Sequence, residues 1–160
     1  MPDRKKDMIA SLEDNGAEVI GYFDSLAPDA LKTRVYTDGP RWTARQVLAH
    51  LITIEGSMQK LFANILAGGS GAPADFDIDR FNRTQPAKLD GLSMPELQQQ
   101  FRDVRRRTVV MVANMTEGDL DRTGRHPFHG HGKLERFVRW AYEHARLHLD
   151  DVRRAQETRR

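Results

Sequence analysis

The amino-acid sequence predicts an all-α protein folded as a four-helix bundle. Three observations support this fold class: two capping boxes mark helix starts, apolar residues recur every three or four positions in four segments, and no segment has a convincing strand-like alternation. The four helices are expected near residues 4–26, 43–67, 93–115 and 133–154, with no substantial sheet beside them.

The first two expected helices each have one apolar face. In the first, the apolar positions are Met8, Leu12, Val19 and Phe23, and Pro28 follows the end of the helix. The second opens with a capping box, in which the side chains of Thr43 and Gln46 satisfy backbone N–H groups of the first turn. Its apolar stripe consists of Val47, Ile54, Met58, Leu61 and Ile65, and Gly68 and Gly69 end it.

The third and fourth expected helices also each have an apolar face. Ser93 and Glu96 form a second capping box, with Pro95 in the first turn. The seam behind it contains Leu97, Phe101, Val104, Thr108, Met111 and Met115, and a solvated face opposite is expected to carry Arg102, Arg105, Arg106 and Arg107. The last helix begins near Leu134, and its apolar positions are Phe137, Val138, Ala141, Ala145 and Val152.

A long connection over residues 67–92 separates the second helix from the third. Short loops join antiparallel neighbours, whereas a connection of this length can cross the bundle and join two parallel helices. Long linkers inside a compact domain are uncommon and often functional. The sequence has no internal repeat, so residues 1–160 are expected to form a single domain.

The composition narrows the class of protein. Apolar residues make up 39% and charged residues 30% of the 160 residues, and the formal charge is +2, which argues against disorder and against a nucleic-acid partner. The chain has no cysteine, so it supplies neither a thiol nucleophile nor a thiolate ligand. Because no secretory signal and no membrane span are recognisable, a cytoplasmic protein is expected.

Three histidines are candidates for one metal site. His144 and His148 are four residues apart, so their imidazoles lie on one face of the last helix, and His50 falls on the apolar stripe of the second helix. Burying three imidazoles without partners costs at least about 1–3 kcal/mol for each unsatisfied group, a cost that a shared metal removes. The alternative is that these histidines lie at the surface or are hydrogen-bonded individually.

The metal is expected to be one divalent transition ion. Imidazole ligands suit zinc, nickel, copper and iron, of which zinc and nickel are the expected ones. The remaining histidines, His126, His129 and His131, belong to a glycine-containing loop, where solvent exposure is expected for the last two. The alternatives are that these two donate to the same metal site or form a second site. Glu55 and Glu143 are also expected at the surface, because their spacing does not place them on the same helix face as their neighbouring histidines.

The order of these motifs resembles the DinB-like (DinB/YfiT) superfamily. The resemblance is carried by Trp42 to Leu51 around His50, by the segment from His126 to Gly130, and by the pair His144 and His148. It implies an up-down-down-up bundle with a long crossover between helices two and three. It also implies that His50, His144 and His148 are the metal ligands. The extra histidines after Pro127 depart from the family pattern.

The segment 75–82 resembles the crossover of superfamily members related to mycothiol-dependent enzymes. That resemblance implies that Asp79 and Asn82 lie near the mouth of a pocket and orient a cofactor or substrate. The alternative is an Asx-rich turn that caps a short helix, and the two accounts are compatible.

The resemblance also implies a function, since several branches of the superfamily are thiol S-transferases. In such an enzyme the metal binds a low-molecular-weight thiol and presents it to a small electrophile. The alternatives are a metal-dependent hydrolase and a non-catalytic metal-binding stress protein. The expected partners are a small-molecule substrate and, by resemblance, a second copy in a homodimer; no catalytic acid or base is identified.

Overall fold

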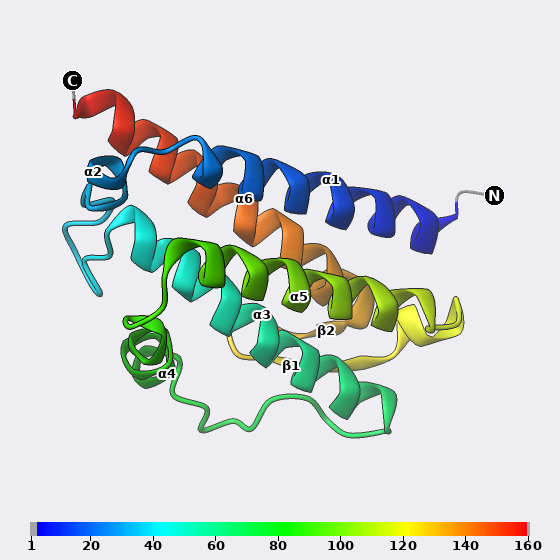
Figure 1. The fold of residues 1–160 in the computed structure, drawn as a ribbon. Helices are drawn as coiled ribbons and strands as arrows, with labels where there is room; N and C mark the ends of the chain where they lie inside the picture. Colours follow the sequence, from blue (N-terminus) through cyan, green and yellow to red (C-terminus); the bar gives the residue numbers. More distant parts are fainter. Residues whose placement is uncertain (1–2, 160) are drawn as a thin grey trace.

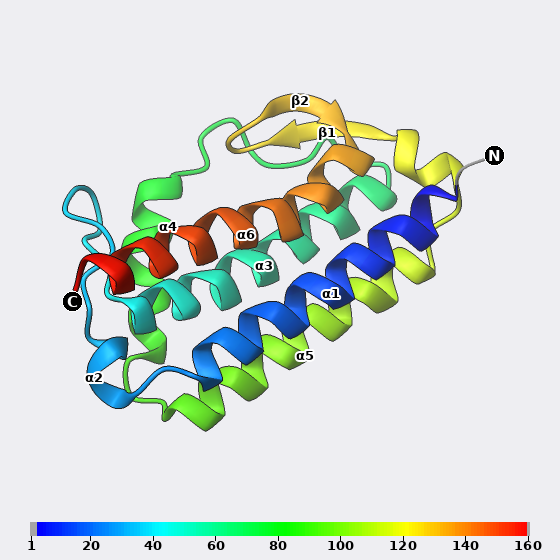
Figure 2. The ribbon, with the colours of Figure 1, turned by 90° about the horizontal axis from the view of Figure 1, so that it is seen from above.

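The computed structural model describes residues 3–159. Its four long helices are α1 (Arg4–Asp24), α3 (Ala44–Leu66), α5 (Met94–Ala113) and α6 (Leu134–Thr158), which together form a bundle (Figures 1 and 2). The all-α prediction is confirmed, and α6 continues beyond its expected end at residue 154. That the whole chain forms a single domain stays a prediction.

The helices are arranged up, down, down, up. Both α1 and α3 pack against α5 and α6, which places α1 and α3 on one diagonal of the bundle. Figure 1 shows α1 and α6 running in one direction and α3 and α5 in the other. The parallel pair α3 and α5 is joined by the long crossover, which carries the short helices α4 (Ile78–Thr84) and η1 (Pro86–Leu89). The predicted topology is therefore confirmed.

Short elements complete the fold. A four-residue helix, α2 (Pro28–Leu31), follows α1, and η2 (Gly118–Asp121) follows α5. An antiparallel hairpin precedes α6, formed by β1 (Thr123–His126) and β2 (Gly130–Lys133). The sequence does not predict these strands, because segments that contain glycine and histidine carry no apolar alternation. Within the described residues no helix is both long and apolar enough to cross a membrane.

The crossover is fastened to the hairpin by backbone contacts. Arg125 N–H donates to the carbonyl of Ser70 and its carbonyl accepts from Ala72 N–H, both at 2.8 Å. Gly71, with a φ of +94°, lies so close that a Cβ atom would be 2.4 Å from the backbone nitrogen of Arg125. Gly124 similarly allows the side chain of Ile65 on α3 to approach, since a Cβ there would be 2.7 Å from it.

A polar layer divides the apolar core into two clusters. The first cluster includes Leu12, Met58, Phe62, Val112 and Phe137. The second includes Val19, Leu48, Leu51, Phe101 and Leu149. Between them lie Asn15, Glu55, Arg105 and Thr108, all of them buried.

Arg105 is the centre of this layer. Its Nε and Nη2 donate to the Glu55 carboxylate at 2.9–3.1 Å, and its Nη1 donates to the carbonyl of Leu12 at 2.8 Å and to Oδ1 of Asn15 at 2.9 Å. The Glu55 carboxylate also accepts a 2.7 Å hydrogen bond from Thr108. Because Nη2 lies 3.5 Å from the carbonyl of Ala141, Arg105 has polar partners on all three other long helices.

Two sequence-based expectations are wrong here. Glu55 and Arg105 were expected at the surface, but their relative exposures are 3% and 4%. Arg105 lies on the buried side of α5 with Phe101 and Thr108, whereas Arg106 is exposed. Gly16 leaves room for the Arg105 side chain, since a Cβ atom at that position would be 3.2 Å from Cγ of Arg105.

We expect Arg105→Met to lower the free energy of unfolding by about 3–5 kcal/mol, because it leaves the buried Glu55 carboxylate without a counter-charge. Urea unfolding followed by circular dichroism measures the effect. The matched control is Arg106→Met, which should change stability by less than about 0.5 kcal/mol. Equal stabilities of the two variants would contradict the structural role assigned to Arg105.

Candidate metal centre

The structure brings His50, His144 and His148 together between α3 and α6. Nε2 of His144 lies 3.0 Å from Nε2 of His148 and 3.5 Å from Nε2 of His50. One nitrogen from each histidine lies within 4.8 Å of the other two. His50 is buried, and the other two histidines are partly buried.

The spacing of these nitrogens fits a metal ion. Nitrogen ligands at about 2.0–2.1 Å from a tetrahedral zinc ion are roughly 3.2–3.4 Å from one another. The two measured Nε2–Nε2 distances, 3.0 and 3.5 Å, lie close to that range. No carboxylate joins the cluster within residues 3–159. Three imidazoles can thus hold one divalent ion and leave a coordination position open.

Hydrogen bonding fixes the orientation of His148. The Tyr36 hydroxyl donates its proton to Oδ2 of Asp151 at 2.6 Å and lies 2.6 Å from Nδ1 of His148. Since a hydroxyl has a single proton, the Tyr36 oxygen accepts from His148, which places the imidazole proton on Nδ1. Nε2 of His148 then presents a lone pair to the centre, as a metal ligand must.

Aromatic rings hold the other two imidazoles. His50 stacks on Trp42, with ring centroids 4.3 Å apart and an interplanar angle of 28°. Its Nδ1 is buried without a hydrogen-bond partner, so Nε2 is its only nitrogen near another polar group. His144 packs beside Trp140, at a centroid distance of 5.2 Å. These contacts limit the rotation of both rings.

The three histidines are neutral at neutral pH. Burial, and secondarily the neighbouring imidazoles, hold the pKa of His50 well below its usual value and lower the pKa of His144 to about 3. Burial also lowers the pKa of His148 to about 4, although Asp151 opposes this shift. Because metals bind the neutral imidazole, the site is in its binding form over a wide pH range.

The hairpin histidines lie outside this cluster. His131 is exposed, as expected, but His129 is only partly so. The His129 ring meets the edge of Trp140 at 4.5 Å, and its Nε2 is buried without a partner. His126 is buried, and its Nδ1 accepts from the backbone N–H groups of Phe128 and His129 at 3.0 and 3.1 Å. The expectation of solvent exposure is therefore confirmed for His131 alone.

Asp79 and Asn82 lie on α4, at a hollow of about 400 Å³ that Trp42 and Gln46 also line. Asp79 is exposed, and Oδ1 of Asn82 is buried without a hydrogen-bond partner. The alternative of an Asx-rich turn that caps a short helix is confirmed, because the Asp77 side chain caps α4 by accepting from Arg80 N–H. Trp42 lines this hollow and also stacks on His50, so one side chain links the hollow to the histidine cluster. A binding role for Asp79 and Asn82 stays a prediction.

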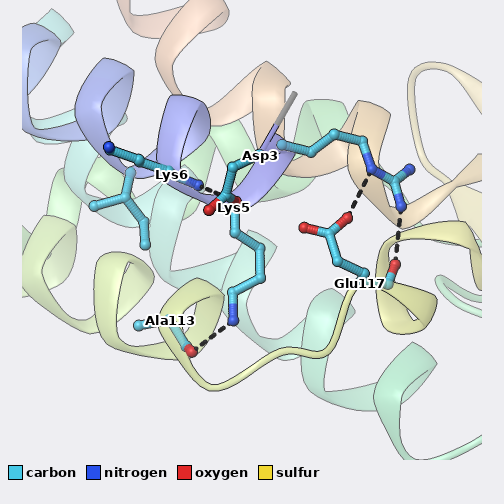
Figure 3. Close-up of a pocket in the computed structure, with 7 residues that line it drawn as sticks. Asp3, Lys5, Lys6, Ala113 and Glu117 are labelled. Carbon is cyan, nitrogen blue, oxygen red and sulfur yellow. Dashed lines mark hydrogen bonds and ion pairs between the residues drawn. The ribbon is translucent and has the colours of Figure 1, made fainter. Parts of the chain in front are cut away.

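A larger hollow, of about 1040 Å³, lies where α1 begins (Figure 3). Two of its charged side chains already have partners within the protein. Lys5 donates to the carbonyl of Ala113, and Arg4 forms an ion pair with Glu117, both at 3.0 Å. No histidine lines it. The histidine cluster is therefore the better candidate for chemistry.

The chain is similar to proteins of one family. A family model described as the DinB superfamily matches residues 11–152. YfiT from Bacillus subtilis, described as a probable metal-dependent hydrolase with an unusual four-helix bundle topology, has a similar structure with a TM-score of 0.78. The two chains are 18% identical, and the match covers 96% of this chain and 86% of YfiT.

Two further solved structures share the fold. An uncharacterized protein from Clostridium difficile 630 is 14% identical with a TM-score of 0.74, and the match covers 96% of each chain. An uncharacterised protein from Escherichia coli UTI89 is 17% identical with a TM-score of 0.72, covering 99% of this chain and 96% of the other. No curated protein matches the sequence.

We expect His148→Ala to remove most of the bound metal, since it deletes one of three converging nitrogens. His131→Ala, on the exposed hairpin strand, is the matched control and should retain the metal. Elemental analysis of protein purified without an affinity tag measures both. A third variant, Tyr36→Phe, should have an intermediate effect and weaken metal affinity about 10- to 100-fold, because it removes the acceptor that orients His148. Undiminished metal in His148→Ala would place the site elsewhere.

A second expectation concerns the metal-free protein at acid pH. The unfolded chain takes up protons on its histidines as the pH falls through about 6.5. Folded His144 and His148 take them up only near pH 3 and 4. The unfolded state then binds more protons, so the free energy of unfolding decreases as the pH falls from about 6.5 to about 4.

Urea midpoints measured in the presence of a chelator test this pH dependence. His144→Phe should flatten the decrease, because one of the titrating imidazoles is gone. His131→Phe should leave the slope unchanged. A midpoint that is constant over this pH range in the unmodified protein would show that the imidazoles are not desolvated.

Proposed function

Because the chain belongs to the DinB superfamily, we propose that it is a metal-dependent enzyme that transfers a low-molecular-weight thiol to a small electrophile. In this proposal His50, His144 and His148 hold one divalent ion, with zinc or nickel the expected metals. The homodimer and the cytoplasmic location expected from the sequence stay predictions.

The composition of the cluster carries the proposal. Three neutral imidazoles without a carboxylate leave the charge of a divalent ion uncompensated, which favours an anionic fourth ligand such as a thiolate. When bound, the ion lowers the pKa of a coordinated thiol and so supplies a nucleophile near neutral pH. Because the chain has no cysteine, the thiol has to arrive with a cosubstrate.

The surrounding residues position the reactants. Tyr36 and Asp151 hold His148 in the tautomer that presents Nε2, and burial of the Tyr36 hydroxyl raises its pKa, so the hydroxyl keeps its proton. Trp42 covers one face of His50 and keeps water from that side. Asp79 and Asn82, at the hollow that Trp42 also lines, are proposed to bind polar groups of the cosubstrate.

Metal-dependent hydrolysis is the second candidate. The observation that favours it is the fold shared with YfiT, which is described as a probable metal-dependent hydrolase. A hydrolase commonly uses a general base to take the proton of water. Here Tyr36 lies between the Asp151 carboxylate and His148, and its hydroxyl donates a hydrogen bond to that carboxylate. Asp151 is therefore a poor acceptor for the proton of a water molecule at the metal centre.

We expect the metal-loaded protein to accelerate adduct formation between a bacterial low-molecular-weight thiol and a small electrophile, measured as loss of free thiol. His50→Ala should abolish both acceleration and metal binding, while His131→Ala retains both. Asp79→Ala and Asn82→Ala should raise the KM for the thiol and retain the metal.

The same preparations also distinguish the alternatives. If no thiol in the panel reacts faster than in the metal-free control while a simple ester or amide is cleaved, the protein is a hydrolase. If neither reaction is accelerated although the metal is bound, it is a non-catalytic metal-binding protein.

A further inference from the structure

An apolar cavity of about 280 Å³ lies beneath the hairpin turn, between α3 and residues 71–78 of the crossover. Figure 2 shows the hairpin and the crossover side by side above α3. Most of the wall is hydrocarbon, supplied by Ile54, Met58, Leu61, Pro73, Phe76 and Phe128. Its volume is near the lower end of the roughly 300–1,000 Å³ typical of ligand pockets, which suits a small molecule.

Two sets of side chains link the cavity to the histidine cluster. Ile54 lines the cavity and follows His50 by one turn of α3, on the same helix face. Phe128 also lines it and stacks on Trp140, with a centroid distance of 5.7 Å and an interplanar angle of 8°. Trp140 in turn packs beside His144. None of the three histidines lines the cavity, so these side chains connect it to the proposed metal centre.

His126 lines this wall, and hydrogen bonds define the protonation of its ring. Its Nδ1 accepts two backbone N–H groups, so the proton of the neutral ring is on Nε2. Nε2 has no hydrogen-bond partner among residues 3–159, and it is not sealed inside the protein as Nε2 of His129 is. Burial, followed by the charges of His129 and Arg136, lowers the pKa of His126 to about 4. The imidazole is thus a neutral donor.

Building on the proposed function, we propose that this cavity binds the electrophile, that the electrophile has an apolar body and a carbonyl oxygen, and that Nε2–H of His126 donates a hydrogen bond to that oxygen. The apolar wall favours the body of such a molecule through the hydrophobic effect. A donor in apolar surroundings gains most from an acceptor, because it lacks a partner there.

Two probes of nearly equal shape test the hydrogen bond directly. Acetophenone has an apolar ring and a carbonyl oxygen, whereas isopropylbenzene replaces that oxygen by a methyl group. We expect His126→Phe to weaken acetophenone binding about threefold to tenfold, as for one neutral hydrogen bond, and to change isopropylbenzene binding by less than about twofold. Tryptophan fluorescence titration of the purified protein measures both, and His131→Phe is the matched control.

A second measurement avoids the variant, because His126→Phe also removes the acceptor of two N–H groups in the hairpin turn. Imidazole ¹⁵N spectra of the unmodified protein should show His126 as the Nε2–H tautomer, and its Nε2 signal should shift with acetophenone but not with isopropylbenzene. An Nδ1–H tautomer, or equal shifts with both probes, overturns the proposal. The proposal is also overturned if a His126→Phe variant that retains the native circular dichroism spectrum binds both probes more weakly by the same factor.

These binding tests are separable from the test of the proposed function. If acetophenone binds through His126 but no thiol adduct forms, the transferase function is wrong and the carbonyl site stands. If adducts form while His126→Phe changes the binding of the two probes by the same factor, the transferase function stands and the role of His126 is wrong.

Discussion

The buried ion pair between Arg105 and Glu55 is the centre of the hydrogen bonds that join all four long helices. Placing two charges in an apolar core is unfavourable unless geometry and further hydrogen bonds compensate, and a mismatch leaves a buried charge without a partner. Here the compensation uses groups on every long helix, so a slip of any helix along its axis would break part of it. His50 lies five residues before Glu55, and His144 lies three residues after Ala141. We infer that the polar layer sets the relative heights of α3 and α6, and hence whether their imidazoles meet.

The connection between α2 and α3 supports two of the three imidazoles at once. It carries Tyr36, which hydrogen-bonds His148, and Trp42, which stacks on His50. The connection folds back on itself, since Val35 N–H donates to the carbonyl of Trp42 at 2.8 Å, and it joins the start of α3 through Ala44 N–H and the carbonyl of Thr33. A segment without regular structure is thereby held well enough to orient ligands on two different helices.

Much of this arrangement could be predicted from the sequence, because it depends on local patterns. Thr43 and Ser93 cap α3 and α5 as their capping-box motifs indicate, and the four-residue spacing of His144 and His148 places both on one face of α6. The layer around Arg105 could not be predicted in this way, since four arginines within six residues resemble a solvated face and the pairing with Glu55 exists only once α3 and α5 are adjacent. Tyr36 lies in a segment without periodicity. The tautomer of His126 depends on turn geometry, which no spacing of residues reveals.

The contact between the crossover and the hairpin separates the frame of the apolar cavity from its lining. The frame consists of backbone: Ser70 and Ala72 bond to Arg125, and Gly71 and Gly124 allow the chains to touch. The lining consists of side chains such as Phe76, Ile78 and Phe128, which project from this frame. Replacing one of these apolar side chains changes the shape of the cavity without removing a hydrogen bond that holds the wall. Single substitutions in this lining can therefore change which ligand the cavity prefers, while the backbone contacts that form its frame are retained.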